Sequence, residues 1–224
     1  MLQSTETNQV IITGKFLEYQ LSHELYGEKF YEFKLQVPRL SDSFDILPVT
    51  ISERLINDNL TTDDKIINVK GQFRSYNNHM DNGNKLKLII FAKDVKIALE
   101  EDIKNPNYVF LDGFVCKEPV YRTTPLGREI CDIIIAVNRA YHKSDYIPII
   151  TWGRNARFSQ NLNIGDNVKT WGRIQSRQYE KKLNNTETIY KTAYEVSVSK
   201  MEINNTNNRK ENEVETEIQV ETEI

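Results

Sequence analysis

The chain has 224 residues, of which 39% are hydrophobic and 27% are charged, and its formal net charge at pH 7 is −3. This length fits one large or two small domains of a soluble globular protein, and two cysteines are too few for a disulfide framework. Three scattered histidines without a C-x-x-C motif leave no zinc site. The N-terminus lacks a signal-peptide pattern, and no apolar run could span a membrane, so we expect a cytoplasmic protein.

The first half of the chain is predicted to form five strands and one short helix within residues 8–97. The strand-like segments are 10–16, 30–37, 45–51, 66–73 and 85–95. Ser52 is a suitable cap for a short helix carrying Leu55, Ile56 and Leu60. Asp81-Asn82-Gly83 predicts a hairpin turn between the last two strands.

The second half repeats this order after a polar linker at 98–107. Within residues 108–203, strands are predicted at 109–115, 128–137, 145–152, 168–174 and 194–199, with a helix near 155–162. Three strands, a helix and two strands is the order of the OB-fold, a small Greek-key barrel. Residues 204–224 are rich in Asn, Glu and Thr and lack aromatics, which predicts a disordered acidic tail. The predicted class is therefore all-β, with two tandem five-stranded OB-fold barrels.

A duplication about 100 residues apart supports two related domains. Six residues recur in register without a gap: Gly27, Val37, Arg39, Asp45, Pro48 and Arg54 reappear as Gly127, Val137, Arg139, Asp145, Pro148 and Arg154. Gly14 and Gly71 also have counterparts in Gly113 and Gly172, shifted by one residue. Glycine and proline constrain the backbone, so their recurrence indicates a shared fold.

The charge is distributed unevenly among the segments. Residues 8–97 hold 12 basic and 12 acidic side chains, for a net charge of 0, whereas residues 108–203 hold 14 and 10, for +4. Residues 204–224 hold 2 and 6, for −4. The second domain is therefore basic and the tail acidic, which the net charge of the whole chain conceals.

No catalytic, metal-binding or cofactor-binding motif appears in the sequence, so we expect a protein that is not an enzyme. The second domain instead mixes aromatic and basic residues. The candidate nucleic-acid-binding residues are Tyr141, Tyr146, Trp152, Tyr179, Arg122, Arg139, Lys143, Arg154, Arg173 and Arg177. Aromatic rings stack on unpaired bases, and a basic groove follows the phosphate chain. The same aromatics could instead belong to the core.

Nearly all of residues 108–202 resembles the bacterial single-stranded DNA-binding protein family. The matching segments are DGFVCKEPVYRTTPLG at 112–127, IAVNR at 135–139, DYIPIITWGR at 145–154 and GDNVKTWGRIQSRQYE at 165–180. The resemblance implies that Tyr141, Tyr146, Trp152 and Tyr179 contact DNA bases. It also implies that Arg122, Arg154 and Arg177 contact phosphates.

The first domain departs from this pattern. At the corresponding offsets it carries Ser41, Ile46 and Ser52 in place of aromatics, and Tyr76 alone could replace Tyr179. We therefore expect the same fold with much weaker DNA binding.

The resemblance also implies partners and an assembly. The family ends in an acidic tail that recruits replication and repair proteins, and here Glu221, Glu223 and Ile224 stand in that position without the family's Pro-Phe ending. The family commonly assembles four OB-folds, which implies a homodimer of this chain. The expected function is sequence-nonspecific binding and protection of single-stranded DNA in replication, recombination or repair. An RNA-binding OB protein, and an OB protein-interaction module of a primosome or conjugation complex, remain as alternatives.

Overall fold

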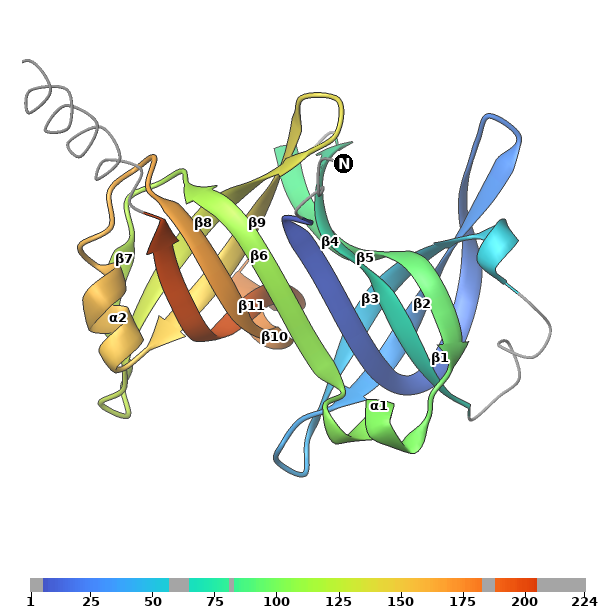
Figure 1. Ribbon diagram of the computed structural model, residues 1–224, viewed down its shortest axis with the longest axis horizontal. Coiled ribbons are helices and arrows are strands. Elements are labelled where there is room, and N and C mark those ends of the chain that lie inside the picture. Colours follow the sequence, from blue (N-terminus) through green and yellow to red (C-terminus); the bar gives the residue numbers. More distant parts are fainter. Residues whose placement is uncertain (1–5, 57–64, 81–82, 183–187, 205–224) are drawn as a thin grey trace, which may run out of the picture.

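Eleven strands and three short helices form the part of the chain that the computed structural model describes, residues 6–56, 65–80, 83–182 and 188–204 (Figure 1). Domain 1 consists of β1 (Asn8–Leu25), β2 (Glu28–Pro38), β3 (Phe44–Ser52), the 3-10 turn η1 (Glu53–Leu55), β4 (Ile66–Met80) and β5 (Gly83–Ile97). Helix α1 (Glu100–Lys104) links it to domain 2. Domain 2 consists of β6 (Asn107–Val115), β7 (Val120–Thr123), β8 (Glu129–Arg139), β9 (Lys143–Trp152), α2 (Arg154–Ser159), β10 (Asn167–Lys182) and β11 (Thr188–Asn204). Among these residues, no helix has the length and apolar character needed to cross a membrane.

Each domain closes into a barrel of the OB type. In domain 1 the strand order β2-β3-β5-β4-β1 is closed by pairing between β1 and β2, and β3 runs parallel to β5. Domain 2 repeats this arrangement as β8-β9-β11-β10-β6, closed by β6 and β8, with the short β7 added beside β8. Alternate residues of each strand point inward, such as Leu47 and Val49 of β3 and Ile147 and Ile149 of β9, and these are buried.

Two of the repeated glycines allow the barrels to close. A Cβ at Gly14 of β1 would collide with the carbonyl oxygen of Gln36 in β2. A Cβ at Gly113 of β6 would likewise crowd the carbonyl oxygen of Ala136 in β8. The backbones approach this closely only because glycine lacks a side chain, which explains why the duplication retains both.

The two barrels share one continuous sheet. Strand β1 pairs antiparallel with β6, and Val10 lies directly opposite Val109. This pairing places β5, β4, β1, β6, β10 and β11 side by side, with the two domains on either side of the β1–β6 seam (Figure 1). The arrangement leaves neither β1 nor β6 as an unpaired edge at the seam.

A second set of contacts, called here the junction, joins the domains through the repeated aspartates. Asp45 of β3 accepts hydrogen bonds at Oδ1 from the backbone N–H of Ser176 (2.6 Å) and from its hydroxyl (2.8 Å). In the equivalent contact of the repeat, Asp145 of β9 accepts a hydrogen bond from the backbone N–H of Ser75 (2.9 Å). Each aspartate is only 2% exposed. The duplication therefore places one buried carboxylate of each domain against the β-hairpin of the other.

The repeated arginines complete the junction. The Nη2 of Arg39 lies 2.5 Å from Asp45 Oδ1, and the Nη1 of Arg139 lies 3.5 Å from Asp145 Oδ1. Burial raises the pKa of Asp145, an effect that the Ser75 hydrogen bond and the charges of Arg139 and Arg74 oppose. Two cations therefore act on one buried carboxylate at the Asp145 side of the junction.

The predicted fold class is confirmed, but several elements differ from expectation. The hairpin strands are longer than predicted: β1 continues to Leu25, β4 to Met80 and β10 to Lys182. Ser52 does cap η1, because its hydroxyl accepts a hydrogen bond from the N–H of Arg54 (3.2 Å). The linker contains helix α1, and β7 was not expected. The predicted hairpin turn at 81–82 and the tail at 205–224 lie outside the described residues.

Candidate nucleic-acid interface

The outer face of β9 carries two of the four predicted aromatics. Tyr146 and Trp152 occupy alternate positions that point away from the barrel, and they are 46% and 37% exposed. Six residues of strand separate them by about 20 Å. The Trp152 Nε1–H donates a hydrogen bond to the hydroxyl of Ser197 in β11 (3.1 Å), which fixes the orientation of the indole. Trp152 is therefore an exposed ring in a defined position, as stacking requires.

Basic residues flank Trp152 across neighbouring strands. On one side, Ile130 of β8 pairs with Trp152 and also with Arg122 of β7. On the other side, Ser197 pairs with Arg173 of β10. The result is a row across the sheet in which one indole lies between two arginines, a suitable arrangement for a base between two phosphates.

The ion pair of Arg122 leaves most of its donors available. Its Nε lies 2.7 Å from Asp132 Oδ2, and the two side chains are 46% and 39% exposed. An ion pair in solvent contributes little, and the guanidinium has four further N–H donors. Arg122 can therefore contact a phosphate without losing a buried partner.

The remaining basic candidates around this row are also exposed. Arg154 begins α2 immediately after Trp152 and Gly153. Arg177 and Tyr179 continue the outer face of β10 beyond Arg173, and Tyr179 is 39% exposed. Together with Tyr146, Trp152 and Arg122, they make the outer face of domain 2 aromatic and basic.

The other three candidates lie where β8 ends and β9 begins, and one of them, Arg139, belongs to the junction. Tyr141 lies in the turn between β8 and β9, where it is 91% exposed and has a positive φ of 63°. Arg139 is an ion-pair partner of Asp145, and its side chain is only 21% exposed. Lys143 begins β9 and is exposed. Arg139 therefore has a structural role that the sequence did not indicate, and its role in binding DNA stays a prediction.

The second tryptophan lies in a different environment. Trp171 of β10 packs against Phe110 of β6, with ring centroids 5.2 Å apart, and the Nζ of Lys200 lies 4.5 Å from its ring. It lies two positions before Arg173 on the outer face of β10, and both line one hollow, but its cross-strand partners are Phe110 and Lys200 rather than Trp152. This difference makes Trp171 a control for Trp152.

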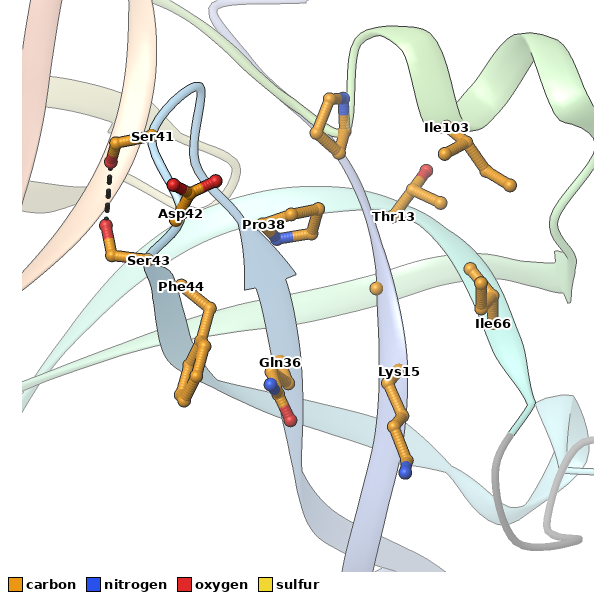
Figure 2. Close-up of a pocket in the computed structure, with 12 residues that line it drawn as sticks. Thr13, Lys15, Gln36, Pro38, Ser41, Asp42, Ser43, Phe44, Ile66 and Ile103 are labelled. Carbon is orange, nitrogen blue, oxygen red and sulfur yellow. Dashed lines mark hydrogen bonds between the residues drawn. The ribbon is translucent and has the colours of Figure 1, made fainter.

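A hollow of about 460 Å³ opens beside the linker in domain 1 (Figure 2). It lies between β1, α1 and the loop from β2 to β3, in which the hydroxyls of Ser41 and Ser43 are 2.8 Å apart. Its aromatic lining is the single side chain of Phe44, and Lys15 is its one basic residue. Its lining does not provide the alternating rings and cations found around Trp152.

Comparisons with known proteins find relatives of the second half of the chain. Residues 106–204 match the model of the single-strand binding protein family. Single-stranded DNA-binding protein 1 of Staphylococcus aureus is 37% identical over 81 residues, which are 33% of this chain and 48% of that protein. Single-stranded DNA-binding protein A of Bacillus subtilis is 36% identical over 81 residues and is matched over 47% of its length. The chain thus spans about half the length of the curated relatives it matches.

Similarity at the level of fold extends over both domains. The wild-type single-stranded DNA-binding protein of Thermus aquaticus has a TM-score of 0.69 with 17% identity, and the match covers 88% of this chain and 92% of that one. At this identity the likeness shows the fold alone. The chain is therefore an OB-fold protein like the single-strand binding proteins, with the family match in residues 106–204.

Proposed function

We propose that this chain binds single-stranded DNA without reading its sequence and protects it during replication, recombination or repair. Bases stack on Tyr141, Tyr146, Trp152 and Tyr179, and the phosphates contact Arg122, Arg139, Lys143, Arg154, Arg173 and Arg177. The observation that carries the proposal is Trp152, an exposed indole held by Ser197 between two arginines. The activity is binding rather than catalysis. We assign it to the cytoplasm, where Cys116 and Cys131, both free thiols, stay reduced.

The proposal predicts how salt and strand type affect binding. Because phosphates are neutralised by basic side chains, the logarithm of the affinity for oligo-dT should fall by about 0.7 per neutralised phosphate for each tenfold rise in salt. Fluorescence anisotropy at several salt concentrations measures this slope, with duplex DNA and an RNA oligomer of equal length as competitors. Single-stranded DNA should compete best. Stronger competition by RNA would favour an RNA-binding protein, and binding of none of the three would favour a protein-interaction module.

We also propose that two chains associate through the outer face of the shared sheet. Tyr108 and Phe110 of β6 lie there beside Ile11 of β1 and Trp171 of β10, and Tyr108 is 36% exposed. These apolar side chains form a row across the seam that a second copy of the chain would cover.

Light scattering coupled to size exclusion tests the assembly. The native protein should have twice the mass of one chain. Tyr108→Glu introduces a charge into the row and should give the mass of one chain, with the circular dichroism of the native fold. A native protein that is monomeric at micromolar concentrations would contradict the assembly.

The tail residues Glu221, Glu223 and Ile224 lie outside the described residues. Their recruitment of replication or repair proteins stays a prediction.

A further inference from the structure

Domain 1 has an aromatic residue near the position that Trp152 occupies in domain 2, but on a different strand. Ser52 is the counterpart of Trp152 on β3. On the neighbouring strand β5, Phe91 pairs with Gln72, just as Ser197 pairs with Arg173 in domain 2. Phe91 is therefore the counterpart of Ser197, the residue that holds Trp152. The ring that domain 1 lacks on β3 is present on β5.

The ring of Phe91 supports a guanidinium group. The Cζ of Arg74 in β4 lies 4.0 Å from the centroid of Phe91. Both Nε and Nη2 of Arg74 donate to Gln72 Oε1, at 3.3 and 2.9 Å. These contacts hold the guanidinium in one orientation, and both rings and guanidinium planes are surfaces on which unpaired bases stack.

The turn between β8 and β9 of domain 2 is fixed close to this surface. The backbone N–H of Tyr146 donates to the hydroxyl of Ser75 in β4 (2.8 Å), and Asp145 accepts from the N–H of Ser75. The guanidinium of Arg139 lies 5.8 Å from the ring centroid of Tyr76, which is 38% exposed. Figure 1 shows this turn beside the β4–β5 hairpin.

On the other side of the junction, the equivalent loop of domain 1 lies over the outer face of domain 2. There a cavity of about 260 Å³ lies between the β2–β3 loop of domain 1 and the outer face of β10 and β11. Leu40 and Ser41 line it together with Arg173 and Ser197. Tyr141 is the counterpart of Ser41, and Gln72 and Phe91 are those of Arg173 and Ser197. The repeat therefore predicts that the loop of Tyr141 lies beside the Arg74–Phe91 surface.

The charge of this surface suits a phosphate chain. Arg74 and Arg139 both act on the carboxylate of Asp145, so two guanidinium groups lie near this buried acid. Lys143 adds another exposed cation at the start of β9. Glu32 on the outer face of β2 is paired with Lys87, whose Nζ lies 2.5 Å from Glu32 Oε2. Basic and aromatic groups thus alternate here as they do around Trp152.

We propose that Arg74 and Phe91, with Tyr76 and Tyr141, form a second single-stranded nucleic-acid contact surface on domain 1. The inference rests on the proposed function and extends it. Tyr146 connects the two surfaces, because its side chain belongs to the outer row of β9 and its backbone is bonded to β4. A strand that stacks on Trp152 can continue past Tyr146 onto domain 1.

Oligonucleotide length separates the two surfaces. In the full-length protein, an oligo-dT of about 8 nucleotides fits one OB-fold, whereas one of about 30 nucleotides reaches both. Phe91→Leu keeps an apolar side chain but removes the flat ring, and Phe91→Tyr keeps the ring. We expect Phe91→Leu to weaken binding of the long oligomer by about fivefold or more and to leave the short one unchanged. Phe91→Tyr should bind both as the native protein does.

Parallel measurements on the native protein and on Trp152→Ala distinguish failure of the second surface from failure of the proposed function. Native affinity of Phe91→Leu for the long oligomer, with Trp152→Ala weakened for both, would overturn the second surface and leave the proposed function intact. Equal weakening of Phe91→Leu for both oligomers would also overturn it, because Phe91 would then act through the fold. If the native protein binds neither oligomer at low salt, the proposed function fails and the second surface fails with it.

Discussion

Trp152→Ala is expected to weaken the binding of oligo-dT by about 5- to 150-fold, the range that corresponds to one lost base stack of about 1–3 kcal/mol. The indole is exposed, lies between Arg122 and Arg173, and is oriented by Ser197. Its removal therefore takes away a prepared stacking surface while leaving the core of the barrel intact. Fluorescence anisotropy of a labelled oligomer at constant salt measures the change.

Trp171→Phe is the matched control for this change. Trp171 packs against Phe110 and Lys200 on the outer face of the shared sheet, and phenylalanine keeps much of that apolar contact. We expect Trp171→Phe to bind oligo-dT with native affinity. The assignment of Trp152 would be wrong if the two variants lost affinity equally, or if only the Trp171 variant lost it.

Asp145→Ala is expected to lower the free energy of unfolding by about 1–3 kcal/mol. The substitution removes a carboxylate that is 2% exposed, so the N–H of Ser75 loses its acceptor and Arg139 loses its ion-pair partner. The Ser75 hydrogen bond joins the two domains, whereas the Arg139 ion pair lies within domain 2. Urea denaturation followed by circular dichroism measures the difference.

Asp145→Asn tests which part of this contact matters. An amide oxygen can still accept the hydrogen bond from Ser75. A neutral side chain also avoids the cost of burying a charge, the same cost that raises the pKa of Asp145. We therefore expect Asp145→Asn to be less destabilised than Asp145→Ala. An Asp145→Ala protein as stable as the native one would show that the contacts of Asp145 with Ser75 and Arg139 contribute nothing to stability.

The duplication in the sequence predicted the fold because it recurs at positions that constrain the backbone. Gly14 and Gly113 recur where the barrels close, and the strand–helix–strand order follows from short alternating segments. The lengths of the hairpin strands were not predictable in the same way. Residues 17–25 of β1 are mostly exposed on both faces, so they lack the alternation that identifies a half-buried strand.

The roles of the repeated charged residues were also hidden from the sequence. Arg39 and Asp45 recur as Arg139 and Asp145, a signal that was visible, but the partner of Asp45 is Ser176, 131 positions away. Because the sequence does not show which distant residues meet in space, Arg139 is interpreted from sequence alone as one more phosphate ligand. Phe91 was missed for a related reason, because the expected aromatic position is on the third strand and the ring stands on β5.

The most direct test of stacking on Trp152 uses Trp171→Phe, which leaves Trp152 as the single tryptophan of the two in the chain. Its fluorescence is followed during titration with an oligo-dT of about 30 nucleotides at low and at high salt. We expect strong quenching that requires more oligomer at high salt, because bases stack on the indole and phosphates bind the neighbouring arginines. An emission that does not change at low salt would contradict it.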